Sequence, residues 1–189
     1  MKTSYIQKFI FDELPIKGSL VVLDDCWQVI AAQRQYPEGL QQLLGELLAA
    51  NVLLTNNLKL NGKVICQIQD NPAFKLVVSE CSHDGLVRAT AKFVAQSETL
   101  VEYADYLKDG HLVVSIDSKA DGQLYQSIIA FNGNNIGDIL NNYMGSMEDH
   151  KLCLLDHFLY LFLLVLSGTH FPKKEKLLHK IRLLQIHRL

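Results

Sequence analysis

The spacing of apolar residues changes at Asn61-Gly62, and this change constrains the fold more than any other feature of the chain. Beyond it, apolar and polar residues alternate over 63–69, as in a strand with one buried face. Further runs of this kind cover 74–80, 86–94, 111–117 and 123–131. The turn sequences between the runs are Asn71-Pro72, His83-Asp84-Gly85, Asp109-Gly110 and Asp121-Gly122. Connections this short join antiparallel neighbours, so the sequence predicts an antiparallel sheet.

Before Asn61, the apolar spacing is helical. The surest helix covers residues 40–60, with Pro37 in its first turn, where a missing N–H costs nothing. One face of this helix carries Leu40, Leu43, Leu44, Leu47, Leu48, Asn51 and Leu54. An earlier helix runs from Asp24 or Asp25 to Gln35, with either aspartate as its N-cap.

Shorter segments complete the predicted fold. Residues 4–11 and 19–23 read as a hairpin or a bent pair of strands, and 134–147 as a short helix. The predicted fold class is therefore α+β, with antiparallel sheets and helices packed against them.

Composition bounds the function class. The 189 residues suffice for one domain, or one domain with an appendage, and 49% of them are hydrophobic with a net charge of -2. This balance is typical of a globular protein and does not indicate a nucleic-acid partner. Residues 1–12 contain no apolar block of the kind that a secretory signal needs, so we expect a cytoplasmic location.

A composition break near residue 147 divides the chain. The segment from Glu148 onward contains seven Lys or Arg residues and four acidic residues, a net charge of +3. The preceding 147 residues contain 11 Lys or Arg residues and 16 acidic residues, a net charge of -5. Five of the seven histidines also lie in this tail. Its apolar run from Leu152 to Leu166 contains Asp156 and is shorter than the ~20 residues of a membrane span. We therefore do not expect a transmembrane helix.

No enzyme fingerprint is present, whether a glycine-rich phosphate loop, a His-Glu-x-x-His pair or a Gly-x-Ser-x-Gly elbow. Asp24-Asp25 could form a carboxylate pair for acid–base work, but a helix cap is the better interpretation. His83 and His111 have no partner that the sequence identifies, and the tail histidines lack the spacing of a zinc site. The prediction is a protein that is not an enzyme, with no catalytic or cofactor-binding residue and an unassigned substrate-binding surface.

The four cysteines are Cys26, Cys66, Cys81 and Cys153. No two of them have metal-ligand spacing, so we predict no bound metal. Cys66 and Cys81 lie on neighbouring predicted strands and could approach closely enough for a bridge, but a strand cysteine is more often a small core hydrophobe. We therefore predict no disulfide.

Several motifs in a fixed order carry a family resemblance. They are "YPEGLQQLLGELLAANVLL", "LKLNGKVICQIQ", "DGHLVVSID", "YQSIIAF" followed by "NG", and "NNYM". From Tyr5 to Ser146 the chain resembles the N-terminal core of the 33 kDa redox-regulated heat-shock chaperone family, also called the 33 kDa chaperonins.

The resemblance implies an ATP-independent holdase that binds unfolded or aggregation-prone proteins during heat and oxidative stress. The family's thiol switch lies in a C-terminal zinc domain with a Cys-x-Cys and a Cys-x-x-Cys pair. This chain contains neither pair, so no zinc ligand or switch disulfide is carried over. We expect a core without the switch domain and without zinc; a homodimer is an open alternative.

The resemblance also shapes the interpretation of the tail. We divide the chain into a chaperone-like core, 1–146, truncated at its C-terminal end, and a divergent or out-of-frame tail, 147–189. The family's core would continue with at least two more strands, which the tail pattern does not show. A helix over Leu152–Leu166 is one alternative. Another is a peripheral membrane protein that uses the Leu-rich run and the basic segment 173–188.

Overall fold

The computed structural model describes residues 4–10, 16–58, 61–93, 102–119, 122–145, 152–157 and 161–167. Their strands form two antiparallel sheets. The five-stranded sheet has the order β5 (Val87–Phe93), β4 (Phe74–Ser82), β3 (Gly62–Gln69), β6 (His111–Ser118), β7 (Leu124–Ala130). The four-stranded sheet has the order β1 (Tyr5–Ile10), β2 (Ile16–Val22), β9 (Leu161–Ser167), β8 (Leu152–His157). The helices are α1 (Asp25–Ala32), α2 (Glu38–Asn57), the 3-10 helix η1 (Tyr103–Leu107) and α3 (Ile136–Gly145).

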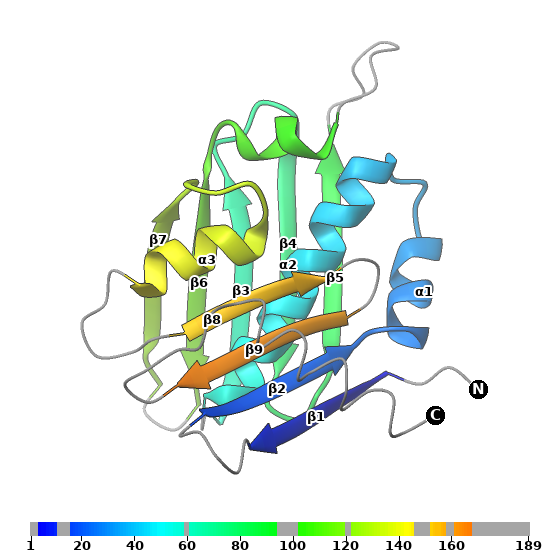
Figure 1. Cartoon of the computed structure of the whole chain (residues 1–189). Helices are drawn as coiled ribbons and strands as arrows, with labels where there is room; N and C mark the ends of the chain where they lie inside the picture. The colour runs from blue at the N-terminus through cyan, green and yellow to red at the C-terminus, as the bar shows by residue number, and fades with distance from the viewer. Residues whose placement is uncertain are drawn as a thin grey trace.

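Helix α2 lies between the two sheets and forms the centre of the core (Figure 1). The predicted apolar face is buried except for the half-buried Leu54, but Ala49, Ala50, Val52 and Leu53 on other sides of the helix are buried as well. A helix that is buried all round needs a partner on each side. The second partner is the four-stranded sheet, which the predicted apolar stripe did not reveal.

The predicted strands and helices of residues 4–145 are confirmed, with small changes at their ends. Helix α1 ends at Ala32, before the predicted Gln35, and α2 begins at Glu38 with Pro37 as its N-cap residue. The Pro37 carbonyl accepts hydrogen bonds from the N–H groups of Leu40 and Gln41, at 3.0 and 2.9 Å. Helix η1 was not predicted; it begins with a reciprocal capping box between Glu102 and Asp105.

The tail departs from the prediction. Residues 152–157 and 161–167 form strands β8 and β9, so both the helix over Leu152–Leu166 and the expected loss of strands after residue 147 are wrong. Strand β9 is an inner strand, paired with β2 from Ile16↔Ser167 to Val22↔Leu161 and with β8 on its other side. A continuous apolar run fits a strand covered on both faces as well as it fits a helix, and helical spacing cannot separate them.

The turn between β3 and β4 is anchored by a buried amide. Asp70 adopts φ 56°, in the left-handed region that aspartate tolerates better than most residues. Asn71 donates to the carbonyls of Tyr106 and Asp109, at 2.9 and 2.6 Å, and accepts from the N–H of Ala73 at 2.9 Å. The turn is thereby tied to the segment that leads into β6.

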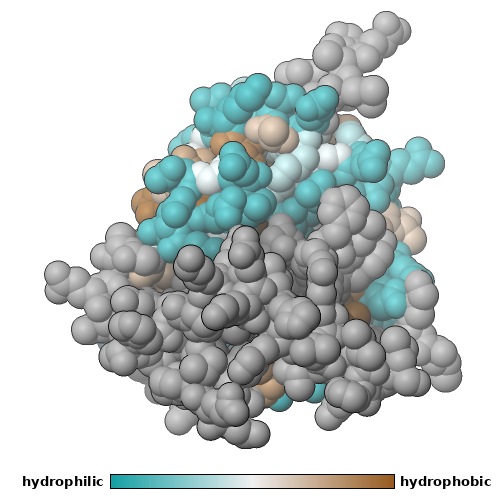
Figure 2. Space-filling model, viewed as in Figure 1, coloured by the Kyte–Doolittle hydropathy of each residue, from teal (hydrophilic) through white to brown (hydrophobic). Residues whose placement is uncertain are grey.

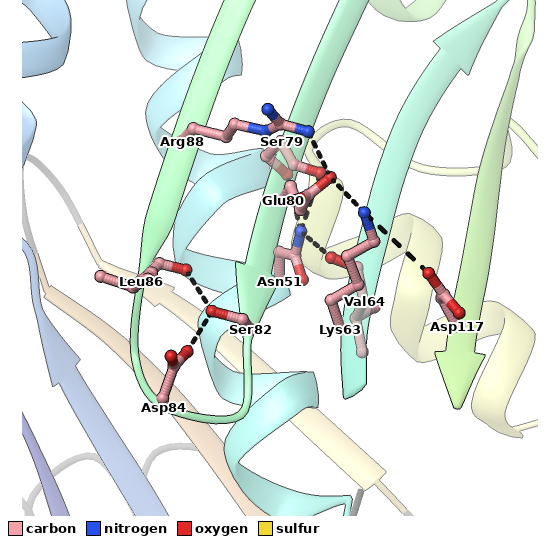
Figure 3. A network of polar contacts seen from close by, with 10 residues as sticks. All are labelled: Asn51, Lys63, Val64, Ser79, Glu80, Ser82, Asp84, Leu86, Arg88 and Asp117. Carbon is pink, nitrogen blue, oxygen red and sulfur yellow. Dashed lines mark hydrogen bonds and ion pairs between the residues drawn. The ribbon is translucent and has the colours of Figure 1, made fainter. Parts of the chain in front are cut away.

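A second buried amide joins α2 to the five-stranded sheet (Figure 3). Asn51 is fully buried, and its Nδ2 donates to the carbonyls of Val64 and Ser79, at 3.2 and 2.9 Å, and to the Ser79 hydroxyl at 3.1 Å. Its Oδ1 accepts from the Thr55 hydroxyl at 3.2 Å. Because a buried amide is satisfied only in one geometry, these bonds fix the position of α2 on β3 and β4.

Candidate functional site

The most exposed group of apolar side chains on one strand lies on β7, an edge strand of the five-stranded sheet. Leu124 and Ile128 are 64% and 66% exposed, and they alternate with exposed Gln126 on the sheet face that points away from the core. Ile129, which points to the opposite face, is buried in the core. Strand β7 contains no charged residue and no proline, so nothing in its sequence discourages pairing with another strand.

Apolar residues do not continue unbroken across the outward face, because Leu124 pairs with Asp117 of β6 and Gln126 pairs with Ser115. Ile128 pairs with Val113 of β6, and Val113 in turn pairs with Gln67 of β3, next to Val78 of β4. Val113 is only 3% exposed, whereas Val78 is half-buried. We call the exposed side chains of Leu124 and Ile128 the β7 apolar surface. By contrast, the described residues on the side of the molecule drawn in Figure 2 are mostly hydrophilic, with scattered apolar ones.

Charged residues occupy the outward face of the sheet from β5 to β6 (Figure 3). Glu80 of β4 lies 2.8 Å from Arg88 of β5 and 3.4 Å from Lys63 of β3, and Lys63 also lies 3.9 Å from Asp117 of β6. Burial alone raises the pKa of Glu80, but its bonds and charge pairing with Arg88 and Lys63 lower it overall. Exposed pairs of this kind add little stability. They make the outward face polar from β5 as far as Asp117 of β6, whereas β7 itself carries no charged residue.

The described cysteines are free thiols. Cys66 pairs with Ser79 and Cys81 pairs with Val64, so the two thiols are diagonal neighbours on the core face of β3 and β4. Burial raises the pKa of Cys66 to about 12 and also raises that of Cys81, which keeps both protonated and weakly reactive at neutral pH. The side chain of Cys153 lies outside the described residues.

The aspartates at the start of α1 act structurally. Asp24 is the N-cap residue, but its carboxylate accepts from the Gln28 side chain at 2.8 Å and makes no cap hydrogen bond. Asp25 accepts from the N–H and hydroxyl of Ser4 and from the N–H of Cys26, and these bonds, led by the Ser4 hydroxyl, lower its pKa. Neither geometry is that of a proton-sharing carboxylate pair.

The two histidines noted in the sequence lie apart. His83 is exposed in the β4–β5 turn, while His111 opens β6 with its Nδ1 3.5 Å from the Asp70 carboxylate. The sequence did not identify this partner, because the left-handed turn at Asp70 brings it into place. Among the described residues, no group of three or more His, Cys, Asp or Glu could hold a metal ion, and no helix is long and apolar enough to cross a membrane.

Sequence reasoning missed one buried carboxylate. Glu46 of α2 is 4% exposed and accepts from the Tyr103 hydroxyl of η1, from the N–H of Ile136 at the start of α3 at 3.3 Å, and from Gln42 at 2.9 Å. An anion at a helix N-terminus is stabilised by the helix dipole. Glu46 therefore joins α2, η1 and α3. The sequence signal that could have identified it is the position of this single acidic residue between the leucine pairs of "LLGELL".

Comparison with known proteins places this fold. The family described as Hsp33 protein matches residues 4–150. The 33 kDa chaperonin of Chromobacterium violaceum is 41% identical over 151 residues, which cover 79% of this chain and 51% of the relative. That of Methylobacillus flagellatus is 37% identical over 147 residues, covering 77% of this chain and 50% of the relative. The chain thus spans about half the length of the curated relatives it matches.

The structural comparison extends further along the chain. The crystal structure of the 33 kDa chaperonin (Heat shock protein 33 homolog) from Thermotoga maritima matches with a TM-score of 0.67 and 16% identity, over 97% of this chain and 67% of that one. This likeness shows the α+β fold, and the relatives matched by sequence are named 33 kDa chaperonins. On the match over residues 4–150, this chain belongs to the Hsp33 family.

Proposed function

We propose that this chain is an ATP-independent holdase: it binds unfolded polypeptides and keeps them from aggregating, without refolding them. The observation that carries the proposal is the β7 apolar surface on a charge-free edge strand. An open edge offers backbone N–H and C=O groups to an extended peptide, and the apolar side chains on the adjoining face bind apolar side chains of that peptide. Membership in a family whose relatives are named chaperonins supports the same function.

The binding mode follows from the chemistry of the surface. Each peptide residue added to an edge strand satisfies backbone groups regardless of sequence, which suits a chaperone with many clients. Leu124 and Ile128 lie four residues apart on one face of β7, with Gln126 between them. In a client strand paired with β7, they would contact every second side chain on that same face. The β7 edge should therefore prefer extended, apolar and weakly charged segments. Native proteins bury such segments, and unfolding proteins expose them.

The proposal includes the absence of thiol control in these 189 residues and a place in the cytoplasm. Neither Cys-x-Cys nor Cys-x-x-Cys occurs in the sequence, and Cys66 and Cys81 are core residues. The membrane alternative gains no support from the described residues, since most of the Leu-rich run lies in strands β8 and β9 rather than in an amphipathic helix. Residues 173–188 lie outside the described part of the chain.

The test is suppression of aggregation, measured by light scattering while a chemically unfolded enzyme is diluted into buffer without ATP. The chain should lower the scattering, and the double substitution Leu124→Ser with Ile128→Ser should remove most of this effect. A matched control is Leu86→Ser, which removes a 71% exposed apolar side chain from the β4–β5 turn. Equal loss of activity in both variants, or none in either, contradicts binding at β7.

A further inference from the structure

Strand β5 forms the other edge of the five-stranded sheet. In an antiparallel pair, the backbone groups of alternate residues point to the partner strand, and those of the residues between point away from it. Just before β5, the N–H of Ser82 donates to the carbonyl of Leu86. Counting in steps of two from the next residue, the N–H and C=O groups of Val87, Ala89 and Ala91 point to the free side of β5. These are the groups with which a further strand would pair.

The link between α1 and α2 lies along this free side (Figure 1). Ala91 donates its N–H to the Tyr36 hydroxyl at 3.3 Å, and its carbonyl accepts from the Arg34 guanidinium at 3.4 Å. The Tyr36 hydroxyl also lies 3.4 Å from the Thr90 hydroxyl. Two side chains thus occupy the donor and the acceptor that a neighbouring strand would otherwise use. We call Arg34 and Tyr36 the β5 latch.

The β5 latch is held in place by its surroundings. Tyr36 is 6% exposed, and its ring packs edge-on against Phe93, with the ring centroids 6.4 Å apart. The Tyr36 carbonyl accepts from the Gln41 side chain at 2.8 Å, and Pro37 follows as the N-cap residue of α2. Helix α1, which precedes the link, also contacts β5. The latch is therefore built into the packing of both helices on β5.

The two edges of the sheet differ in what they offer to a second copy of the chain. Strand β7 pairs only with β6 among the described strands and carries no charged residue, so its edge can accept a strand. If β5 were open as well, β7 of one copy could pair with β5 of the next. A contact between two different surfaces of this kind does not close on itself and can add copies without limit.

We propose that the β5 latch prevents this head-to-tail strand pairing between copies of the chain. With β5 closed, strand pairing through β7 joins at most two copies, and growth stops there. The chain can thus keep one edge open to extended peptides without polymerising through its own sheet. The proposal concerns self-association, so it stands or falls separately from client binding at β7.

The test is sedimentation velocity of the full chain over a wide range of concentrations. Arg34→Ala with Tyr36→Ala removes the latch, and this variant should form oligomers larger than a pair whose size grows with concentration. Adding Gln126→Pro should stop the growth. The N–H of Ser118 donates to the Gln123 carbonyl, so the same count directs the N–H of Gln126 to the free side of β7. A proline there removes a donor that strand pairing needs.

Gln35→Ala is the matched control, because Gln35 is exposed and lies between the two latch residues; it should sediment like the unsubstituted chain. Near-ultraviolet circular dichroism checks that each variant is folded. If the first variant does not fold, Arg34→Ala with Tyr36→Phe keeps the buried ring, removes both hydrogen bonds and should form the same oligomers at higher concentration. The proposal is overturned if a folded latch variant sediments like the unsubstituted chain, if Gln126→Pro leaves the oligomers intact, or if the unsubstituted chain itself grows without limit.

Discussion

Replacing Asn51 tests whether its buried hydrogen bonds hold α2 on the sheet. Asn51→Leu keeps the number and branching of the side-chain heavy atoms but removes the donations to the Val64 and Ser79 carbonyls and to the Ser79 hydroxyl. It also removes the oxygen that accepts from Thr55. The neighbours keep other partners: the Thr55 hydroxyl still donates to the backbone carbonyl of residue 51, at 2.8 Å, and the Ser79 hydroxyl to that of Leu47, at 3.3 Å.

The magnitude follows from these contacts. Each lost bond contributes about 1 kcal/mol net, and the remaining partners limit the cost of stranded groups, so Asn51→Leu should lower the free energy of unfolding by about 2–4 kcal/mol. For a chain of this size, about 3 kcal/mol corresponds to a melting temperature roughly 6–12 °C lower. Asn51→Asp should cost more at pH 7, since it puts a carboxylate against two carbonyl oxygens without solvent.

The Asn51→Asp variant also makes a pH prediction. Burial beside carbonyl oxygens raises the folded-state pKa of the new carboxyl above its unfolded value of about 3.9. The folded state therefore holds the proton more tightly than the unfolded state does. The destabilisation grows as the pH rises from the unfolded-state pKa to the folded-state pKa. Lowering the pH from 7 to 5 should narrow the stability difference between the Asp and Leu variants.

Urea unfolding monitored by circular dichroism measures these differences, with Thr55→Val as the control. That control removes the hydroxyl that donates to Asn51 Oδ1 and to the residue 51 carbonyl, and it should cost about 1 kcal/mol. The reasoning is refuted if Asn51→Leu unfolds within about 0.5 kcal/mol of the unsubstituted chain, the range typical of surface substitutions.

Three further outcomes are expected. A chain ending at Ser146 loses β8 and β9 and uncovers β2, so its urea midpoint should fall clearly; an unchanged midpoint would support the out-of-frame interpretation of the tail. The 189-residue chain should purify without stoichiometric zinc, and peroxide should not change its aggregation suppression; bound zinc by elemental analysis, or a large gain in activity, would contradict this. Cys66 should react with iodoacetamide at pH 8 far more slowly than half-buried Cys26, because burial raises the Cys66 pKa to about 12; equal rates by mass spectrometry would be contrary evidence.

Much of the fold could be predicted because it depends on local patterns. The alternation over 63–69 and the following runs reflects a sheet with one face on the core, and the short Gly- and Asn-containing turns permit only antiparallel neighbours. The leucine spacing of α2 is equally local. Sequence order alone could not show that β7 and β5 are the edges, since β3 pairs with β6 across a long connection.

For the same reason, the sequence could not predict the β7 apolar surface or the cavity beside β1, β2 and α2. Leu124 and Ile128 look in the sequence like any outward-facing strand residues, and only the absence of a neighbouring strand beyond β7 among the described residues exposes an edge. The cavity joins Ser4, Asn56 and Ser82, which are far apart in the chain. No spacing rule relates residues that meet only when two sheets close over one helix.

The sequence by itself determined the α+β class, the antiparallel five-stranded sheet, the central helix and the family, because each rests on local periodicity or on ordered motifs. Only the tertiary structure decided that Leu152–His157 and Leu161–Ser167 are strands and that α2 is also buried on the side of Ala49 and Leu53, outside its predicted apolar face. A continuous apolar run satisfies the requirements of a buried helix and of a buried strand alike. What separates them is the partner, and here the partner of β9 is β2, more than a hundred residues earlier in the chain.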